Sequence, residues 1–391
     1  MTTLAATNTA RDTLERIDRL GWWAIVVTVA ALQVSIAVAQ IGVTVAGLAW
    51  LMRVALAGVP ALPRFLVPLG VYVAWTLLSA ALSRDPAVSV PDTKQLVLFL
   101  LVPLVFEFAR GARARTLVSL ALTVGAASAL VGIVQYGVLN YGGLGRRPQG
   151  TLSHWMTYSG TLMLVICAGV SRLLFDTRDR AWAAVAMPAL VTSLALTLTR
   201  SAWVGVFAGV GTLFLLKDRR LVGLLPIAVA VVVAVAPASV TDRVYSIVDR
   251  NDPTSRDRMA MLESGQAMVR DYPLTGVGPD MVSQVYPRYR VPWAVQPSNP
   301  HLHNVPMQIA AERGLPALAA WLWFLVAAIR GLWPRLRRSR TPALAAGGLA
   351  AIAAMLAAGL FEYNFGDSEF LMLFLVMITV PFAADRDGGL P

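Results

Sequence analysis

Long apolar runs dominate this chain and are separated mostly by short polar connections. A helix needs roughly 20 apolar residues to cross the hydrocarbon core of a bilayer. On this basis we expect about twelve membrane-spanning helices. They are expected at residues 22–38, 41–58, 65–82, 95–109, 115–138, 157–175, 181–198, 202–216, 221–238, 316–333, 342–360 and 368–384. Within them, the Ala/Val-rich segment 227–238 and the Ala-rich segment 343–358 are suited to close helix packing.

One long polar interval, residues 239–315, interrupts this pattern. It contains two helical patterns: the first is expected to be capped by Ser255, and the second by Asn304, with Gly314 marking its end. In the first pattern, Met261 and Met268 lie seven residues apart on one face. We therefore predict an all-α polytopic membrane protein in which residues 1–391 form a single transmembrane domain with a long, partly helical loop.

The composition and the distribution of charge support this class and predict an orientation. The chain is 57% hydrophobic and 14% charged, whereas soluble domains contain about 25% charged residues. With the N-terminus inside, 20 of the 33 Lys and Arg residues fall on inner segments and five on short outer loops. This bias predicts that both termini are cytoplasmic and that the loop 239–315 faces outward. It also accounts for the net charge of +11, so we expect no nucleic-acid partner.

A few outward arginines depart from the orientation rule. Arg146, Arg147 and Arg200 lie at outward helix ends, where the rule disfavours positive charge. Each could extend toward lipid headgroups, or several together could hold a phosphate or diphosphate through their planar guanidinium groups. Arg258 lies in the first turn of the first loop helix, where it could form an ion pair within the loop or join the helix N-terminus in binding an anion.

His301 and His303 precede the second loop helix. A metal site is one interpretation of the pair, but no third ligand lies at a recognisable spacing, and the lone Cys167 lies in an apolar run. A hydrogen-bonded structural histidine is another interpretation. The third is a general base, because the pKa of histidine lies near neutrality. His303 is the candidate for that role, and His301 is expected to point elsewhere in the loop.

These motifs in this order resemble the O-antigen ligase family, which shares its fold with O-antigen polymerases and protein O-oligosaccharyltransferases. The motifs are the turn 197–203 with Arg200, the helix with Asp257-Arg258, the turn 273–279, and His301-Leu302-His303-Asn304 followed by Gly314. The resemblance covers roughly residues 65–380 and is strongest over 197–316. Two departures are the sequence Leu198-Thr199-Arg200-Ser201, where the family often has Ser-Arg-Gly, and Leu262, where a Trp is common.

The resemblance implies a GT-C-like glycosyltransferase of the bacterial inner membrane that needs neither metal nor cofactor. It would move a glycan from undecaprenyl diphosphate to an acceptor at the periplasmic face, with inversion at the anomeric carbon. His303 would act as the general base, and Arg200 and Arg258, with Arg147 and Arg146, would bind the diphosphate. The further substrate-binding candidates are His301, Asn304, Glu362 and Asp367. The turn 362–369 could equally be a solvated loop that caps a helix.

Several functions are compatible with these features. Ligation of O-antigen to lipid A-core is the leading expectation, because of the length of the chain and because no additional C-terminal periplasmic domain is expected. A polymerase of lipid-linked repeats and a protein O-oligosaccharyltransferase are alternatives within the superfamily. A transporter of an anionic substrate is a more distant alternative, since transporters place ionisable groups near the bilayer midplane, where this sequence offers only Glu107 and Arg53.

Overall fold

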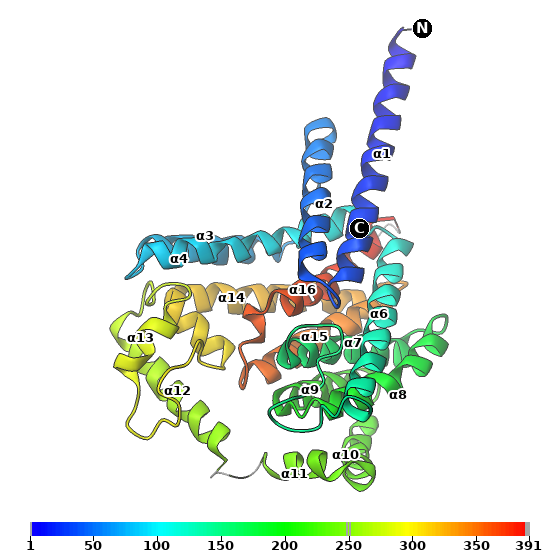
Figure 1. Cartoon of the computed structure of the whole chain (residues 1–391). Helices are drawn as coiled ribbons and strands as arrows, with labels where there is room; N and C mark the ends of the chain where they lie inside the picture. Colours follow the sequence, from blue (N-terminus) through cyan, green and yellow to red (C-terminus); the bar gives the residue numbers. More distant parts are fainter. Residues whose placement is uncertain (1, 248, 250–251, 388–391) are drawn as a thin grey trace.

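The computed structural model describes residues 2–247, 249 and 252–387, with side chains from residue 11 onward (Figure 1). The regular secondary structure of these residues is helical, apart from an isolated bridge between Gly143 and Arg146. The helices are α1 Thr2–Ala31, α2 Ile36–Ala57, α3 Leu66–Ala81, α4 Pro86–Asp92, η1 Thr93–Leu100, α5 Leu101–Phe108, α6 Ala112–Gly137, α7 Trp155–Phe175, α8 Arg180–Leu196, α9 Arg200–Lys217, η2 Arg219–Gly223, α10 Leu224–Val235, α11 Ala238–Tyr245, α12 Pro253–Asp271, α13 Val282–Tyr289, α14 Val305–Arg338, α15 Pro342–Gly359, η3 Asn364–Gly366, α16 Ser368–Ala384 and η4 Asp385–Asp387.

Six segments of the described chain are long and apolar enough to cross a membrane: 36–57, 86–108, 112–137, 155–175, 305–338 and 342–359. Three shorter apolar helices are α3, α8 and α16. The expected polytopic helical membrane protein is confirmed, whereas the count of twelve spans is not. The break between the first two helices lies at residues 32–35, and not at 39–40 as expected.

Small residues let α9 and α15 approach closely in the core. In the Ala-rich helix α15, four alanines are fully buried: Ala345, Ala346, Ala350 and Ala354. On the facing helix α9, a Cβ added at Gly205 would lie 2.9 Å from the Ala354 carbonyl oxygen. The expected close packing is therefore confirmed here. It is wrong for segment 227–238, because α10 is largely exposed.

The charges expected as exceptions within the apolar runs are paired in the structure. Glu107 on α5 is fully buried and accepts hydrogen bonds from Arg53 on α2 and Arg386, the latter at 2.7 Å. This pairing satisfies a buried carboxylate with two guanidinium groups. It also places η4 against α5, since Arg386 donates to the Phe106 carbonyl at 3.1 Å as well.

Within the loop 239–315, residues 253–315 form a compact unit of α12, α13 and the start of α14, on the side of the molecule away from the N-terminus, whereas α11 lies beside α10 (Figure 1). Met261 and Met268 of α12 are buried in a separate apolar cluster of this unit, together with Tyr286 and Leu302. The expected apolar face of α12 is therefore confirmed. The expected cap is wrong: the helix begins after Asp252, whose carboxylate accepts from the Ser255 backbone N–H at 2.9 Å. The loop also contains α11 and α13, which were not expected.

The glycines of the turn 273–279 allow the loop to pack against a kink in α14. At Gly314 the backbone is non-helical, with φ 83° and ψ 170°, which opens the helix and leaves carbonyl groups without helical partners. The backbone N–H groups of Val277 and Gly278 donate to the carbonyls of Ala311 and Glu312 at 2.8 and 2.9 Å. A Cβ at Gly276 would lie 2.2 Å from the Glu312 carbonyl carbon, so this contact requires glycine.

Candidate functional site

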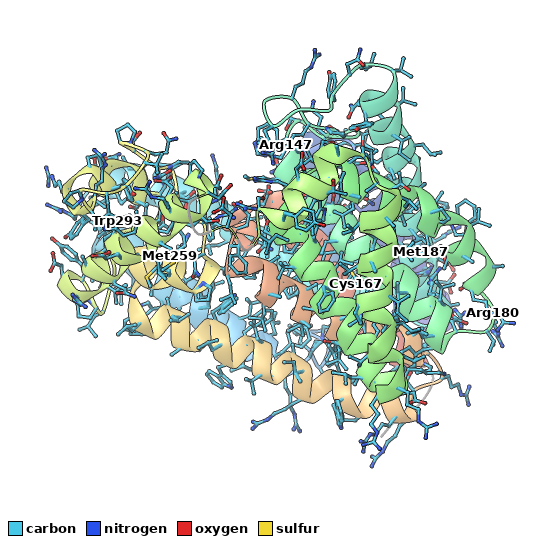
Figure 2. The ribbon with its side chains drawn as sticks, turned by 90° about the horizontal axis from the view of Figure 1, so that it is seen from below. Arg147, Cys167, Arg180, Met187, Met259 and Trp293 are labelled. Carbon is cyan, nitrogen blue, oxygen red and sulfur yellow. The ribbon has the colours of Figure 1, made fainter. Side chains whose placement is uncertain are left out.

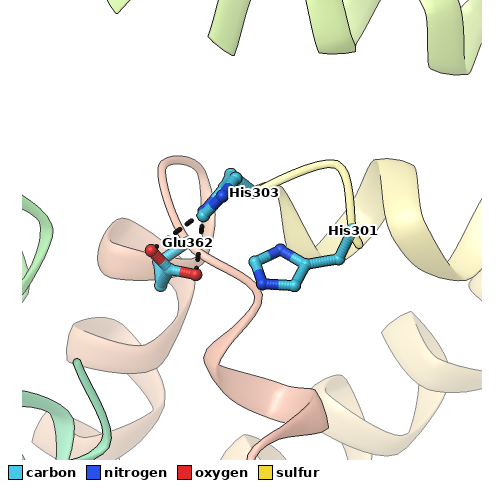
Figure 3. A group of neighbouring side chains, drawn as sticks. All are labelled: His301, His303 and Glu362. Carbon is cyan, nitrogen blue, oxygen red and sulfur yellow. Dashed lines mark hydrogen bonds and ion pairs between the residues drawn. The ribbon is translucent and has the colours of Figure 1, made fainter. Parts of the chain in front are cut away.

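His303, His301 and Glu362 form a small cluster where the long loop meets the turn between α15 and α16 (Figure 3). The Nδ1 atom of His303 lies 3.0 Å from each oxygen of Glu362. The rings of His301 and His303 have their centroids 4.1 Å apart. The expectation that His301 points elsewhere is therefore wrong, because the short bend through Leu302 brings both rings to the same side.

Asn304 fixes the position of His303 relative to Glu362. Its side-chain oxygen caps α14 by accepting from the Met307 N–H at 2.9 Å, as the sequence predicts. Its amide nitrogen donates to the Leu360 carbonyl at 3.1 Å, two residues before Glu362. Both ends of the Asn304 amide are thus engaged within the protein, so the residue positions the site and is less suited to binding substrate.

The electrostatics of the cluster determine which nitrogen of His303 carries a proton. Burial would raise the pKa of the Glu362 carboxyl, but the His303 hydrogen bond and the positive charge of Arg258 lower that pKa to about 2. Glu362 is therefore ionised at neutral pH and can only accept hydrogen bonds. The neutral His303 ring must then donate from Nδ1, which leaves the Nε2 lone pair free to accept a proton.

His301 is neutral in the same conditions. Burial lowers the pKa of its ring to about 4, with a further contribution from His303. Its Nδ1 atom is buried and has no hydrogen-bond partner.

Four arginines from separate segments lie on one side of this cluster. They are Arg147 before α7, Arg200 at the start of α9, Arg243 on α11 and Arg258 on α12. Burial lowers the pKa of Arg147 to about 10, and the positive charges of Arg243, Arg200 and Arg258 contribute. Burial and the positive charges of Arg200 and Arg258 also lower the pKa of Arg243. We call these four residues the arginine cluster.

Arg200 links the start of α9 to the long loop that carries Arg243 and Arg258. It is buried and donates to the Ser246 carbonyl at 2.7 Å and to the Asp252 carboxylate at 2.8 Å. Arg200 does not extend toward lipid headgroups, because these bonds direct it into the loop. Asp252 also caps α12, so the contact joins the start of α9 to the helix that carries Arg258.

Arg258 and Arg147 have donors left for a ligand. The Nε atom of Arg258 is buried without a partner, and its Nη2 lies 3.9 Å from Glu362. Arg147 donates to the carbonyls of Leu144 and Leu198 at 3.2 and 3.5 Å. These arrangements suit a ligand that supplies several oxygen atoms with negative charge. Figure 2 shows Arg147 between the loop unit, marked by Met259 and Trp293, and the helices that contain Cys167 and Met187.

Arg146 is not brought to the arginine cluster in this structure. Its guanidinium lies over the Tyr141 ring, 4.1 Å from the centroid, and donates to the Tyr141 hydroxyl at 2.9 Å. The neighbouring Arg147 faces the opposite way, toward Leu198 and the ring of Trp155.

A cavity of about 360 Å³ adjoins Glu362 and His301, and none of the four arginines of the arginine cluster lines its described wall. Asp367 lies in its wall and precedes α16 as the N-cap residue. Burial raises the pKa of the Asp367 carboxyl to about 7. Glu362 and Asp367 therefore both border the cavity, and neither belongs to a freely solvated loop.

His301, His303 and Glu362 could also hold a metal ion, since their ligand atoms lie within 4.8 Å of one another. The sequence offered no third ligand because Glu362 is 59 residues from His303. A divalent ion at this point would compete with the His303 hydrogen bond and would lie close to the positive charge of Arg258. The donor set fits a metal in number, whereas the adjacent guanidinium disfavours one.

Three residues of the site were not singled out from the sequence: Arg243, Asp252 and His154. Arg243 and Asp252 belong to the long loop and have no distinguishing motif in the sequence. His154 caps α7 through Nδ1, which accepts from the Met156 N–H at 3.2 Å, and its side chain lines the cavity. The signal for His154 was available, because it is the third of only three histidines in the chain.

Comparison with known proteins gives one family. The family model for O-antigen ligase matches residues 184–322, which include Arg200, Arg243, Arg258 and His303. No curated protein matches the chain. The match confirms the resemblance seen in the sequence and supports a membrane glycosyltransferase of the O-antigen ligase and polymerase superfamily.

Proposed function

We propose that this chain, which carries an O-antigen ligase domain, transfers O-antigen polysaccharide from undecaprenyl diphosphate to lipid A-core at the periplasmic face of the inner membrane. The observation that carries the proposal is His303, held by Glu362 at the edge of the arginine cluster. A base beside a site for a polyanion is what transfer from a diphosphate-linked sugar requires.

In this mechanism Nε2 of His303 accepts the proton of the acceptor hydroxyl. The hydroxyl oxygen forms a bond to the anomeric carbon as the bond from that carbon to the phosphate oxygen breaks. The electron pair of the broken bond leaves with the diphosphate, and attack from the opposite face inverts the anomeric centre. Glu362 keeps the ring oriented and stabilises the imidazolium that forms, as a carboxylate does beside other catalytic histidines.

The arginine cluster would bind the diphosphate and the charge that grows on it. Arg258 supplies the unpartnered Nε donor, and Arg147 and Arg243 add positive charge. Arg200 contributes charge while its bonds to Ser246 and Asp252 keep the cluster in place. Because a diphosphate is a good leaving group, this scheme needs no general acid, metal or cofactor.

Transfer by the purified full-length protein tests the proposal. The substrates are undecaprenyl-diphosphate-linked glycan and lipid A-core, and the product is read from its mobility on a gel. His303→Ala should reduce the rate by about 10²- to 10⁴-fold, with donor binding retained. His301→Ala should have a smaller effect and is the matched control.

Glu362→Gln separates orientation from base chemistry. Since the neutral amide can still accept from Nδ1 but does not stabilise the imidazolium, kcat should fall by on the order of 10²-fold. The acid limb of the pH–rate profile should also move to lower pH, while KM for the donor stays unchanged. Full transfer by His303→Ala, or loss of transfer with EDTA and its recovery with a divalent ion, would refute this mechanism and favour the metal site.

Polymerisation of lipid-linked repeats is the second candidate function, because the family match supports the shared superfamily. The two functions differ in the acceptor. Transfer to a second undecaprenyl-linked repeat in place of lipid A-core, in the same assay, would identify a polymerase.

A further inference from the structure

The cavity beside Glu362 differs in charge from the arginine cluster. Its wall contains the acidic side chains of Asp92, Asp280, Glu312, Glu362 and Asp367. Burial raises the pKa of Asp367 to about 7, so the wall is acidic without every group being fully ionised at neutral pH. Its one arginine, Arg313, is buried and already bonded to Glu312 at 2.6 Å, with Asp92 at 3.7 Å. Basic groups therefore gather in the arginine cluster and acidic groups in the cavity wall, and Glu362 lies next to both, because it lines the cavity and is 3.9 Å from Arg258.

The cavity also has unused hydrogen-bonding capacity. Asn364 in its wall is 7% exposed, and its side-chain oxygen has no hydrogen-bond partner. His301 adds a buried Nδ1 without a partner. A buried polar atom without a partner is costly. A ligand that donates hydrogen bonds would remove that cost.

Carboxylates and amides in a small cavity are suited to hydroxyl groups. A sugar hydroxyl donates to a carboxylate or an amide oxygen and accepts from an amide nitrogen. The wall supplies amides at Gln95 and Asn364, and the Phe370 side chain adds an apolar surface. The volume of about 360 Å³ is near the lower end for small-molecule sites, about 300–1,000 Å³. It suits the end of a glycan.

We infer that this cavity binds the terminal sugar of the acceptor and selects an uncharged, hydroxyl-rich sugar over a phosphorylated one. The inference rests on the proposed function, since it assigns the acceptor to the cavity and the donor diphosphate to the arginine cluster. A phosphate in the cavity would lie among these acidic side chains without a free cation in the described wall, which is unfavourable. Binding of the donor diphosphate in this cavity is disfavoured for the same reason.

Two matched acceptors test the inference in the transfer assay described above. They are one core oligosaccharide with a neutral terminal sugar and the same oligosaccharide phosphorylated on that sugar. The wild-type protein should use the neutral acceptor at least about tenfold more efficiently in kcat/KM, a difference of about 1.4 kcal/mol. Equal use of both acceptors would overturn the inference.

Substitutions in the cavity wall show which residues bind the acceptor sugar and discriminate against its phosphorylated form. Asn364→Leu should raise the acceptor KM by about tenfold, the effect of one lost hydrogen bond, and leave the donor KM unchanged. Asn364→Asp keeps the size of the side chain and should increase discrimination against the phosphorylated acceptor. Asp280→Asn should reduce that discrimination; asparagine tolerates the φ of 59° at this position.

Asp271→Asn is the matched control, because Asp271 is an exposed carboxylate of the same loop that bonds Tyr289 outside the cavity. It should change neither acceptor KM nor selectivity. Acceptor KM values that are the same in Asn364→Leu, Asp280→Asn and Asp271→Asn as in wild type would place the acceptor elsewhere.

Direct binding of the two oligosaccharides, measured without donor, separates this inference from the proposed function. If the wild-type protein transfers to neither acceptor but binds the neutral one, and Asn364→Leu weakens that binding by about tenfold, the sugar site stands and the proposed transfer falls. If neither oligosaccharide binds, the sugar site is refuted.

Discussion

His303 has a backbone conformation that side chains rarely adopt, with φ 47°. Strain of this kind is of order 1–3 kcal/mol per residue and is common at active sites. The cap by Asn304 and the bond to Glu362 hold the residue there. The strained backbone at His303 thus lowers the stability of the protein while it fixes the orientation of the imidazole ring.

Substitution of His303 should therefore separate stability from activity. His303→Gly and His303→Ala should both lose transfer, but the glycine variant should be the more stable of the two by about 1 kcal/mol, because glycine adopts positive φ without strain. Thermal unfolding of the purified variants gives the comparison. A glycine variant less stable than the alanine variant would contradict the strained conformation.

Arg258 and Arg200 should respond differently to removal, although both belong to the arginine cluster. Arg258→Ala should abolish donor binding with little loss of stability, because its Nε has no partner. Arg200→Ala should abolish transfer and also destabilise the protein by about 1–3 kcal/mol, since Asp252 and Ser246 lose their donor. Donor binding and thermal unfolding measured side by side check both outcomes. Equal stability of the two variants would show that the Asp252 bond is unimportant.

At the scale of elements, the kink of α14 positions the site. A Cβ at Gly314 would lie 1.9 Å from the Leu274 carbonyl oxygen, and the φ of 83° disfavours a side chain. Gly314→Ala should therefore destabilise the protein by more than about 2 kcal/mol and reduce transfer. Gly70→Ala in α3, where nothing lies within 4 Å of the added Cβ, is the control. It should be neutral or slightly stabilising. A Gly314→Ala variant as stable as the control would contradict the close packing at the kink.

The elements were predictable where the signal was local. Helix positions follow from apolar runs, and the Asn304 cap and the Gly314 interruption follow from residue type. The cap of α12 was assigned to Ser255, although Asp252 followed by Pro253 also fits a helix start, since Asp favours the N-cap and Pro the first helical position. The pairing of His303 with Glu362 has no local signal, since it depends on how α14 and α15 pack.

At the scale of the whole molecule, the charge distribution predicts a topology that can be tested directly. Reporter fusions at Arg338 and at the C-terminus should behave as cytoplasmic, and a fusion near Pro292 as periplasmic. The bias of 20 inner against five outer basic residues is the basis. Arg338 ends α14, and Pro292 lies in the loop unit at its other end. A cytoplasmic signal near Pro292 would place the arginine cluster and the cavity on the wrong side for a periplasmic reaction.

The bond between His303 and Glu362 has a consequence for biosynthesis. The family match at residues 184–322 contains the histidine but neither Glu362 nor Arg147. A ribosome that has just completed the matched region has therefore made a chain whose imidazole still lacks its carboxylate. The ring can be oriented only after α15 and the turn that follows it have been made and have packed against the loop. Orientation of the imidazole would thus wait for a segment beyond the matched region, and a chain arrested before Glu362 would lack an oriented ring.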